Sequence, residues 1–210
     1  MADIISQFEK DQLIEVINIG ASKAATALAS MIGGKKVLIQ PPEAFIDSAE
    51  KAPAFVGKLQ EVETVVLLKF LGDVPGIMML SFSPQAALKL ASFLTQGHKK
   101  QLPVLDEMDR SALCEAGNVL SGSAIASLSK FLDLNILQSV PDTATDMLGS
   151  IIDAVVVEMA ENSGIILAFR VKLTIIDDGK EDIPGQLFFM FEPKSTDKIL
   201  AALKKKFSIA

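Results

Sequence analysis

The sequence predicts an α+β fold with a pseudo-twofold tandem repeat: a mixed β-sheet with two long motif-bearing helices packed on it. The first observation behind this prediction is a polar pattern that occurs twice, one hundred residues apart: Asp11, Glu15 and Asn18, then Ser111, Glu115 and Asn118. The second is a Pro-Gly turn that opens two matching segments, residues 74–84 and 183–193. The third is that helical apolar periodicity alternates with short β-rich segments in both halves.

The two long helices are predicted at about residues 7–32 and 106–131. Ser6 and Glu9 have the spacing of a capping box at the start of the first helix. Gly33-Gly34 follows its last apolar residue, where glycine commonly ends a helix. The second helix is predicted because the same pattern returns.

Strands and shorter helices fill the rest of each half. In the first half, extended segments are predicted at residues 36–40, 43–46, 61–70 and 77–82. Pro41-Pro42 separates the first two segments, because proline cannot continue a ladder. Ser83-Pro84 has the composition of a helix start, so a helix should follow the hairpin. The second half should repeat this order, with an extended segment at 135–140, a strand pair and a final helix.

The chain is predicted to be a single domain, residues 1–210, made of two repeats at about 6–97 and 104–207. The polar loop 97–103 is the expected junction. The Pro-Gly segments are 109 residues apart rather than 100, so the second repeat carries nine extra residues between Pro141 and Pro184. Two positions are open for them: residues 146–153, where a short helix would fit, and the turn 177–182.

Composition narrows the class of protein. Half of the 210 residues are hydrophobic and the formal net charge is −6 at pH 7. The chain has no Trp or Tyr to stack on bases, so nucleic acid is not an expected partner. The N-terminal residues lack the features of a signal peptide, and no apolar run approaches the length of a membrane span. We expect a cytoplasmic protein without membrane insertion.

Each long helix carries one polar stripe. On a helical wheel of about 100° per residue, the stripes hold these residues: Asp11, Glu15, Asn18 and Ser22; Ser111, Glu115, Asn118 and Gly122. Leu13 and Leu113 fall on the opposite, apolar side, so the stripes should face solvent. A solvated face is the ordinary explanation for one such stripe. Core packing does not require Glu and Asn at the same offsets twice, and their recurrence favours a functional role.

The sequence gives little support to several kinds of catalytic or cofactor site. His98 is the only histidine and lies in the predicted junction loop, a poor place for a catalytic triad. Cys114 takes the place of Ile14 in the repeat and is interpreted as a small hydrophobic residue, not a nucleophile. No Walker loop, GxGxxG after a strand or zinc-ligand spacing occurs, so no cofactor or metal of the chain's own is expected.

A Glu and Asn pair suits a site that another molecule completes. A neutral carboxamide is not a general base, but its fixed donor and acceptor can orient a water molecule. The carboxylate offers a negative charge to a cationic group. The stripes therefore indicate water orientation beside an incoming positive charge.

The motifs resemble the CheC family of chemotaxis response-regulator phosphatases, of the CheC, CheX and FliY type. The resemblance is carried by Glu15-x-x-Asn18, by Glu115-x-x-Asn118, by Pro41 and Pro141, and by the run from Asn18 to Leu28. It covers essentially the whole chain, including both Pro-Gly hairpins. The family usually has Gly-Asn where this chain has Ser22-Lys23, which leaves the first site the less certain of the two.

The resemblance implies hydrolysis of the aspartyl-phosphate of the response regulator CheY. In that family the Asn positions the attacking water and the Glu pairs with the regulator's lysine, which assigns Asn18, Asn118, Glu15 and Glu115 as catalytic. The Mg²⁺ is supplied by the regulator. The receptor deamidase CheD is a possible second partner on the same ground. A non-catalytic adaptor that binds phosphorylated regulator or CheD through the same stripes is the alternative.

The remaining stripe residues are candidates for contact with the regulator: Asp11, Ser22, Ser111 and Gly122. Ile19 and Val119 share a wheel angle beside the stripe, roughly 80° from its origin. We expect them to offer apolar contact to a docked regulator. Burial under a neighbouring loop is the equally simple alternative.

Overall fold

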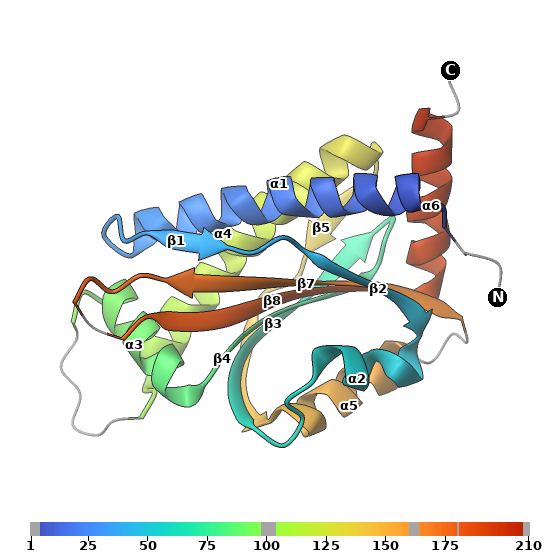
Figure 1. Cartoon of the computed structure of the whole chain (residues 1–210). Coiled ribbons are helices and arrows are strands. Elements are labelled where there is room, and N and C mark those ends of the chain that lie inside the picture. The colour runs from blue at the N-terminus through green and yellow to red at the C-terminus, as the bar shows by residue number, and fades with distance from the viewer. Residues whose placement is uncertain (1–4, 98–103, 160–163, 180, 208–210) are drawn as a thin grey trace.

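A computed structural model describes residues 5–97, 104–159, 164–179 and 181–207, and it has the expected α+β fold (Figure 1). The first half contains α1 Gln7–Met31, β1 Val37–Ile39, β2 Glu43–Ser48, η1 Ala49–Lys51, α2 Ala52–Val56, β3 Val62–Gly72, β4 Gly76–Phe82 and α3 Pro84–Leu94. The second half contains α4 Glu107–Leu132, β5 Ile136–Gln138, β6 Asp142–Met147, α5 Leu148–Met159, β7 Ile165–Ile175, β8 Ile183–Phe191 and α6 Pro193–Phe207. His98 and most of the predicted junction lie outside the described residues.

Capping interactions mark the start of both long helices, and two glycines follow the end of the first. At the start of α1, the Glu9 amide donates to Ser6 Oγ at 3.2 Å and the Ser6 amide donates to Glu9 Oε2 at 2.8 Å. Gly33 and Gly34 follow the helix at φ of 72° and 79°, a conformation that costs glycine little. The second helix starts with another capping box, between Asp106 and Asp109.

The sheet has eight strands in the order β1-β7-β8-β4-β3-β5, with β2 also on β7 and β6 also on β3. All of the pairings among the described strands are antiparallel, so the expected mixed sheet is wrong in this detail. The reason is geometric. Each half contributes a hairpin, and a twofold axis normal to the sheet places the central strands β4 and β8 side by side in opposite directions.

The two halves exchange strands. β1 and β2 of the first half pair with β7 of the second, while β5 and β6 of the second half pair with β3 of the first. The strand order is unchanged when the halves are interchanged and the list is reversed. Both repeats thus contribute to each side of one continuous sheet.

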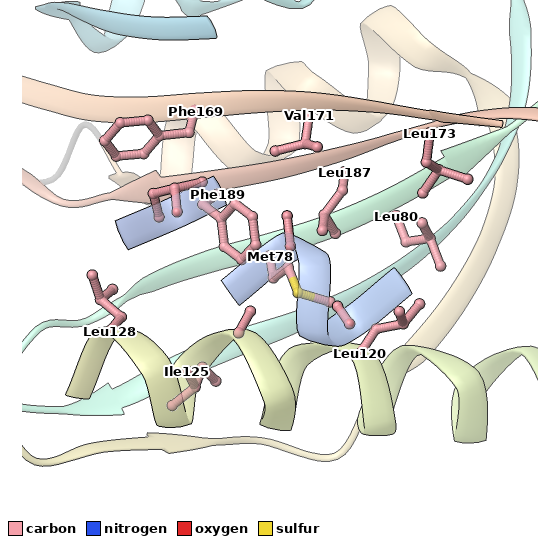
Figure 2. Close-up of a cluster of buried hydrophobic side chains, with 14 of the residues drawn as sticks. Met78, Leu80, Leu120, Ile125, Leu128, Phe169, Val171, Leu173, Leu187 and Phe189 are labelled. Atoms are coloured by element: carbon pink, nitrogen blue, oxygen red, sulfur yellow. The ribbon is translucent and has the colours of Figure 1, made fainter. Parts of the chain in front are cut away.

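Helices cover both faces of the sheet (Figure 1). On one face, α1 and α4 cross at Gly20, where an added Cβ would lie 3.1 Å from the Ala124 Cα atom. Figure 2 shows side chains of β4, β7 and β8, among them Met78 and Phe189, directed toward Leu120 and Leu128 of α4. The other face carries α2 and α5 over a smaller cluster. Within the described residues, no helix has the length and apolar character needed to span a bilayer.

The extra residues of the second repeat occupy both of the positions left open. Phe82 pairs with Thr64 in one hairpin and Phe191 pairs with Leu167 in the other, which makes the second turn six residues longer. The rest are in the region of α5, which has 12 residues where α2 has 5. The expected short helix is therefore present, although it starts at Leu148.

Candidate functional site

The predicted stripe on α1 faces solvent. Asp11, Glu15 and Ser22 are exposed and Asn18 is half-buried, whereas Leu13 on the opposite side is fully enclosed. Gln7 Nε2 donates a hydrogen bond to Asp11 Oδ1 at 2.7 Å, which holds the first stripe residue. The wheel angles placed this surface correctly because a helix of this length has a fixed repeat.

The stripe on α4 is equally accessible. Ser111 and Glu115 are exposed, while Asn118, Val119 and Gly122 are half-buried. Ile19, the counterpart of Val119, is 43% exposed, so it is not covered by a neighbouring loop. The structure thus brings each Glu next to its Asn on an open surface, as predicted, with the flanking apolar residue beside the pair.

A cavity of about 770 Å³ opens beside the second pair. It lies between α4 and the extended chain that follows β5, and its lining includes Ser111, Glu115, Asn118, Gln138, Val140 and Pro141. Val140 is 89% exposed, which leaves an apolar rim at the opening. Glu115 and Asn118 therefore form part of the wall of a cavity that a group of another molecule could enter.

The Asn118 side chain is held by a neighbour that the stripe analysis did not identify. Gln138 Nε2 donates to Asn118 Oδ1 at 2.6 Å, and Ser121 Oγ donates to Gln138 Oε1 at 2.5 Å. Strand alternation could have revealed this: Gln138 lies two residues after the buried Ile136, and residues i and i+2 share a sheet face. The missing information was that this face lies against α4.

Cys114 lines the same cavity but is not suited to nucleophilic attack. Its Sγ lies 3.7 Å from the Pro141 carbonyl oxygen. Burial, with a smaller contribution from the charge of Asp142, raises the pKa of the Cys114 thiol. A thiol that stays protonated is a weak nucleophile. The side chain is half-buried rather than fully enclosed, but the interpretation as a packing residue agrees with this environment.

In the part of the chain that the structure describes, no group of three or more His, Cys, Asp or Glu side chains is placed to hold a metal ion. The groups available for chemistry at the two sites are the carboxylates of Glu15 and Glu115 and the carboxamides of Asn18 and Asn118, with the cavity beside the second pair.

Comparison with known proteins finds a chemotaxis-protein family model over each of these two helices. The model of the CheC-like family matches residues 8–46, which include α1 except for its first residue, and the model of the chemotaxis phosphatase CheX matches residues 64–159, which include α4. The protein is also 28% identical to the CheY-P phosphatase CheC of Bacillus subtilis (strain 168) over 202 residues, 95% of each chain.

The chain is similar to CheC-type chemotaxis phosphatases in both of its halves. Among CheC-type folds, it resembles FliY of Thermotoga maritima with a TM-score of 0.74 and 21% identity, covering 97% of this chain and 99% of that one. It also resembles the structure of the CheX-CheY-BeF3-Mg²⁺ complex from Borrelia burgdorferi, with a TM-score of 0.53 and 16% identity over 85% of this chain and 99% of that one. The matches extend over both halves of the CheC-type repeat.

Proposed function

We propose that this protein is a phosphatase for the aspartyl-phosphate of a CheY-like response regulator. The observation that carries the proposal is that a Glu and Asn pair is presented to solvent on each of two long helices. The similarity to the B. subtilis CheY-P phosphatase CheC over nearly the full length supports the same activity. We also propose a cytoplasmic location, as the sequence predicts.

In the proposed mechanism the regulator's phosphorylated site docks on a stripe, and the Asn side chain enters it. At the second site, the Asn118 carboxamide orients a water molecule in line with phosphorus. Glu115, an exposed carboxylate at the cavity, pairs with the regulator's lysine. Holding the water in one orientation lowers the entropic part of the barrier. Asn18 and Glu15 are proposed to do the same on α1.

The required rate effect is modest. A hundredfold acceleration corresponds to about 2.7 kcal/mol of barrier lowering, which is within the effect of one well-placed polar group. An acyl phosphate already hydrolyses unaided, so the protein need not supply a nucleophile of its own.

The regulator is proposed to bring the Mg²⁺. The similar CheX structure is a complex that contains CheY, BeF3 and Mg²⁺ together. CheD stays a proposed second partner, supported by the family resemblance alone.

The test is phosphate release from a phosphorylated CheY-like regulator. Asn18→Ala and Asn118→Ala should each lower the added rate, and the double variant should return it to the regulator's own rate. A double variant with the wild-type rate would remove the proposal. Phosphate-dependent binding without faster hydrolysis by the wild-type protein would instead identify an adaptor.

A further inference from the structure

We propose that Gln138 is a positioning residue of the second site, and that it makes the second site the faster of the two. This inference rests on the proposed phosphatase function. Gln138 holds the Asn118 carboxamide in one orientation, whereas no residue that the structure describes gives Asn18 an equivalent hydrogen bond.

The contacts form a short chain of hydrogen bonds behind Asn118. Ser121 is fully buried, and its Oγ lies 2.5 Å from Gln138 Oε1. Gln138 Nε2 lies 2.6 Å from Asn118 Oδ1 and 3.3 Å from the Asn118 backbone oxygen. The carboxamide of Asn118 is thus connected, through Gln138, to a hydroxyl that the core keeps in place.

The first site has apolar residues at both positions. Ala21 stands one hundred residues before Ser121 in the repeat and is buried. Ile39 pairs with Leu173 on β7 just where Gln138 pairs with Phe70 on β3.

Leu173 and Phe70 are equivalent because they pair with Gly185 and Gly76, the glycines of the two matching Pro-Gly segments. Neither Ala21 nor Ile39 can donate a side-chain hydrogen bond. Among the described residues, Asn18 makes no side-chain hydrogen bond like that of Asn118.

The hydrogen bond has two consequences for a water-orienting amide. It restricts rotation of the Asn118 carboxamide, so less freedom is lost when water and phosphoryl group arrive. It also polarises the carbonyl that accepts it, which strengthens the remaining hydrogen bonds of the same amide. Both effects act on the chemical step rather than on docking of the regulator.

The experiment isolates each site in the full-length protein. Asn18→Ala leaves only the second site active, and Gln138→Met is then added to remove the donor while nearly preserving side-chain volume. The kcat for phosphate release should fall by about five- to tenfold with KM for the phosphorylated regulator unchanged. An unchanged kcat, or a change confined to KM, would overturn the proposal.

The reciprocal variant uses the repeat as its own control. In the Asn118→Ala background only the first site is active, and Ala21→Ser with Ile39→Gln rebuilds the chain of hydrogen bonds there. Its kcat should rise toward that of the second site. Should Gln138→Met lower Tm enough to unfold the protein under assay, Ser121→Ala removes the other end of the chain and should lower kcat in the same direction.

A measurement without the regulator separates this proposal from the proposed function. The side-chain NH₂ group of Asn118 gives its own signals in a ¹H–¹⁵N NMR spectrum. Gln138→Met should shift these signals and increase averaging, while those of Asn18 stay in place. If the wild-type protein fails to accelerate phosphate release, the proposed function is wrong. If the Asn118 signals are the same in the wild type and in Gln138→Met, the proposed positioning role is wrong.

Discussion

Glu63 is a carboxylate that the fold encloses, with 5% of its surface exposed. Burial raises the pKa of Glu63, and the hydrogen bond that Ser81 Oγ donates at 2.8 Å opposes this shift only in part. A folded-state pKa above the unfolded value means that the native protein binds the proton more tightly. The resulting stability is present below the unfolded pKa and is lost as pH rises through the folded pKa.

Glu63→Gln should therefore stabilise the protein at pH 7, because the amide keeps an acceptor for Ser81 without a buried charge. We expect a Tm about 2–4 °C higher than wild type at pH 7, with the difference vanishing below pH 4.5, the ordinary value for this group. Thermal unfolding across this pH range measures it. Glu61→Gln is the control, since Glu61 is exposed and paired with exposed Lys58. A pH-independent difference would contradict the assignment.

Ile19 and Val119 flank the two pairs at equivalent positions. An exposed apolar side chain beside a polar site can contribute to docking of a protein partner. Ile19→Asp and Val119→Asp should each weaken binding of the phosphorylated regulator by roughly three- to tenfold while the far-UV CD spectrum is retained. Titration calorimetry measures the affinity, and unchanged affinity in both variants would remove this role.

At the scale of residues, the sequence predicted the features that depend on the angular position of a residue around one helix. The exposure of Glu15 and Glu115 followed from the repeat of 3.6 residues per turn. The role of Gln138 did not follow, because it depends on which helix lies opposite a strand residue. That contact joins residues from two elements, and no local pattern contains it.

At the scale of elements, the crossing of α1 and α4 depends on the absence of a side chain at Gly20. A Cβ at this position would lie 3.1 Å from the Ala124 Cα and 3.2 Å from its carbonyl oxygen, both backbone atoms that cannot rotate away. Gly20→Val should lower the free energy of unfolding by about 1–3 kcal/mol through overpacking. Urea denaturation measures this change.

Gly122→Ala is the comparison on the partner helix, at a glycine where the structure leaves room for a side chain. Its Cβ would meet only the Gln138 side chain at 3.8 Å, an ordinary contact. Replacing glycine by alanine within a helix should then gain about 0.5–1 kcal/mol. If both variants were equally destabilised, helix propensity or solvent exposure, rather than the close approach at Gly20, would set the tolerance of these helices.

Helix boundaries were predictable because their determinants are local. The predicted start of α1 is the observed one, and the predicted end of α1 and both predicted ends of α4 differ from the structure by one residue. The alignment of the strands between the two repeats was not predictable in this way. The count from each Asn matched Pro41 with Pro141, but the strand registers match Pro42 with Pro141, since Glu43 faces Arg170 where Asp142 faces Leu67. The connection after α4 is one residue shorter, and Asp133, the residue that follows α4, has a φ of 55°. The short helix α2 was missed.

At the scale of the molecule, the exchange of strands between halves makes the repeats interdependent. A sequence repeat shows that two halves are alike, but the same pattern fits two separate units and two interlocked ones. The structure has the interlocked form, in which β3 and β7 each have neighbours from both halves. Strand pairing between distant segments is fixed by the shared core, which is not visible in either repeat alone.

Fragments 1–103 and 104–210 should therefore fail to fold when produced separately. Each fragment would lose the strands that pair with its β3 or β7, and it would lose the long helix that packs against its own at Gly20. Apolar surface and unpaired backbone groups would then be exposed. Neither fragment should show cooperative thermal unfolding by CD, whereas the two produced together should associate and recover it. Cooperative unfolding of either fragment alone would mean that a half can pair β1 and β2, or β5 and β6, with its own long hairpin, and the exchange would then be a choice between equivalent partners rather than a requirement of the fold.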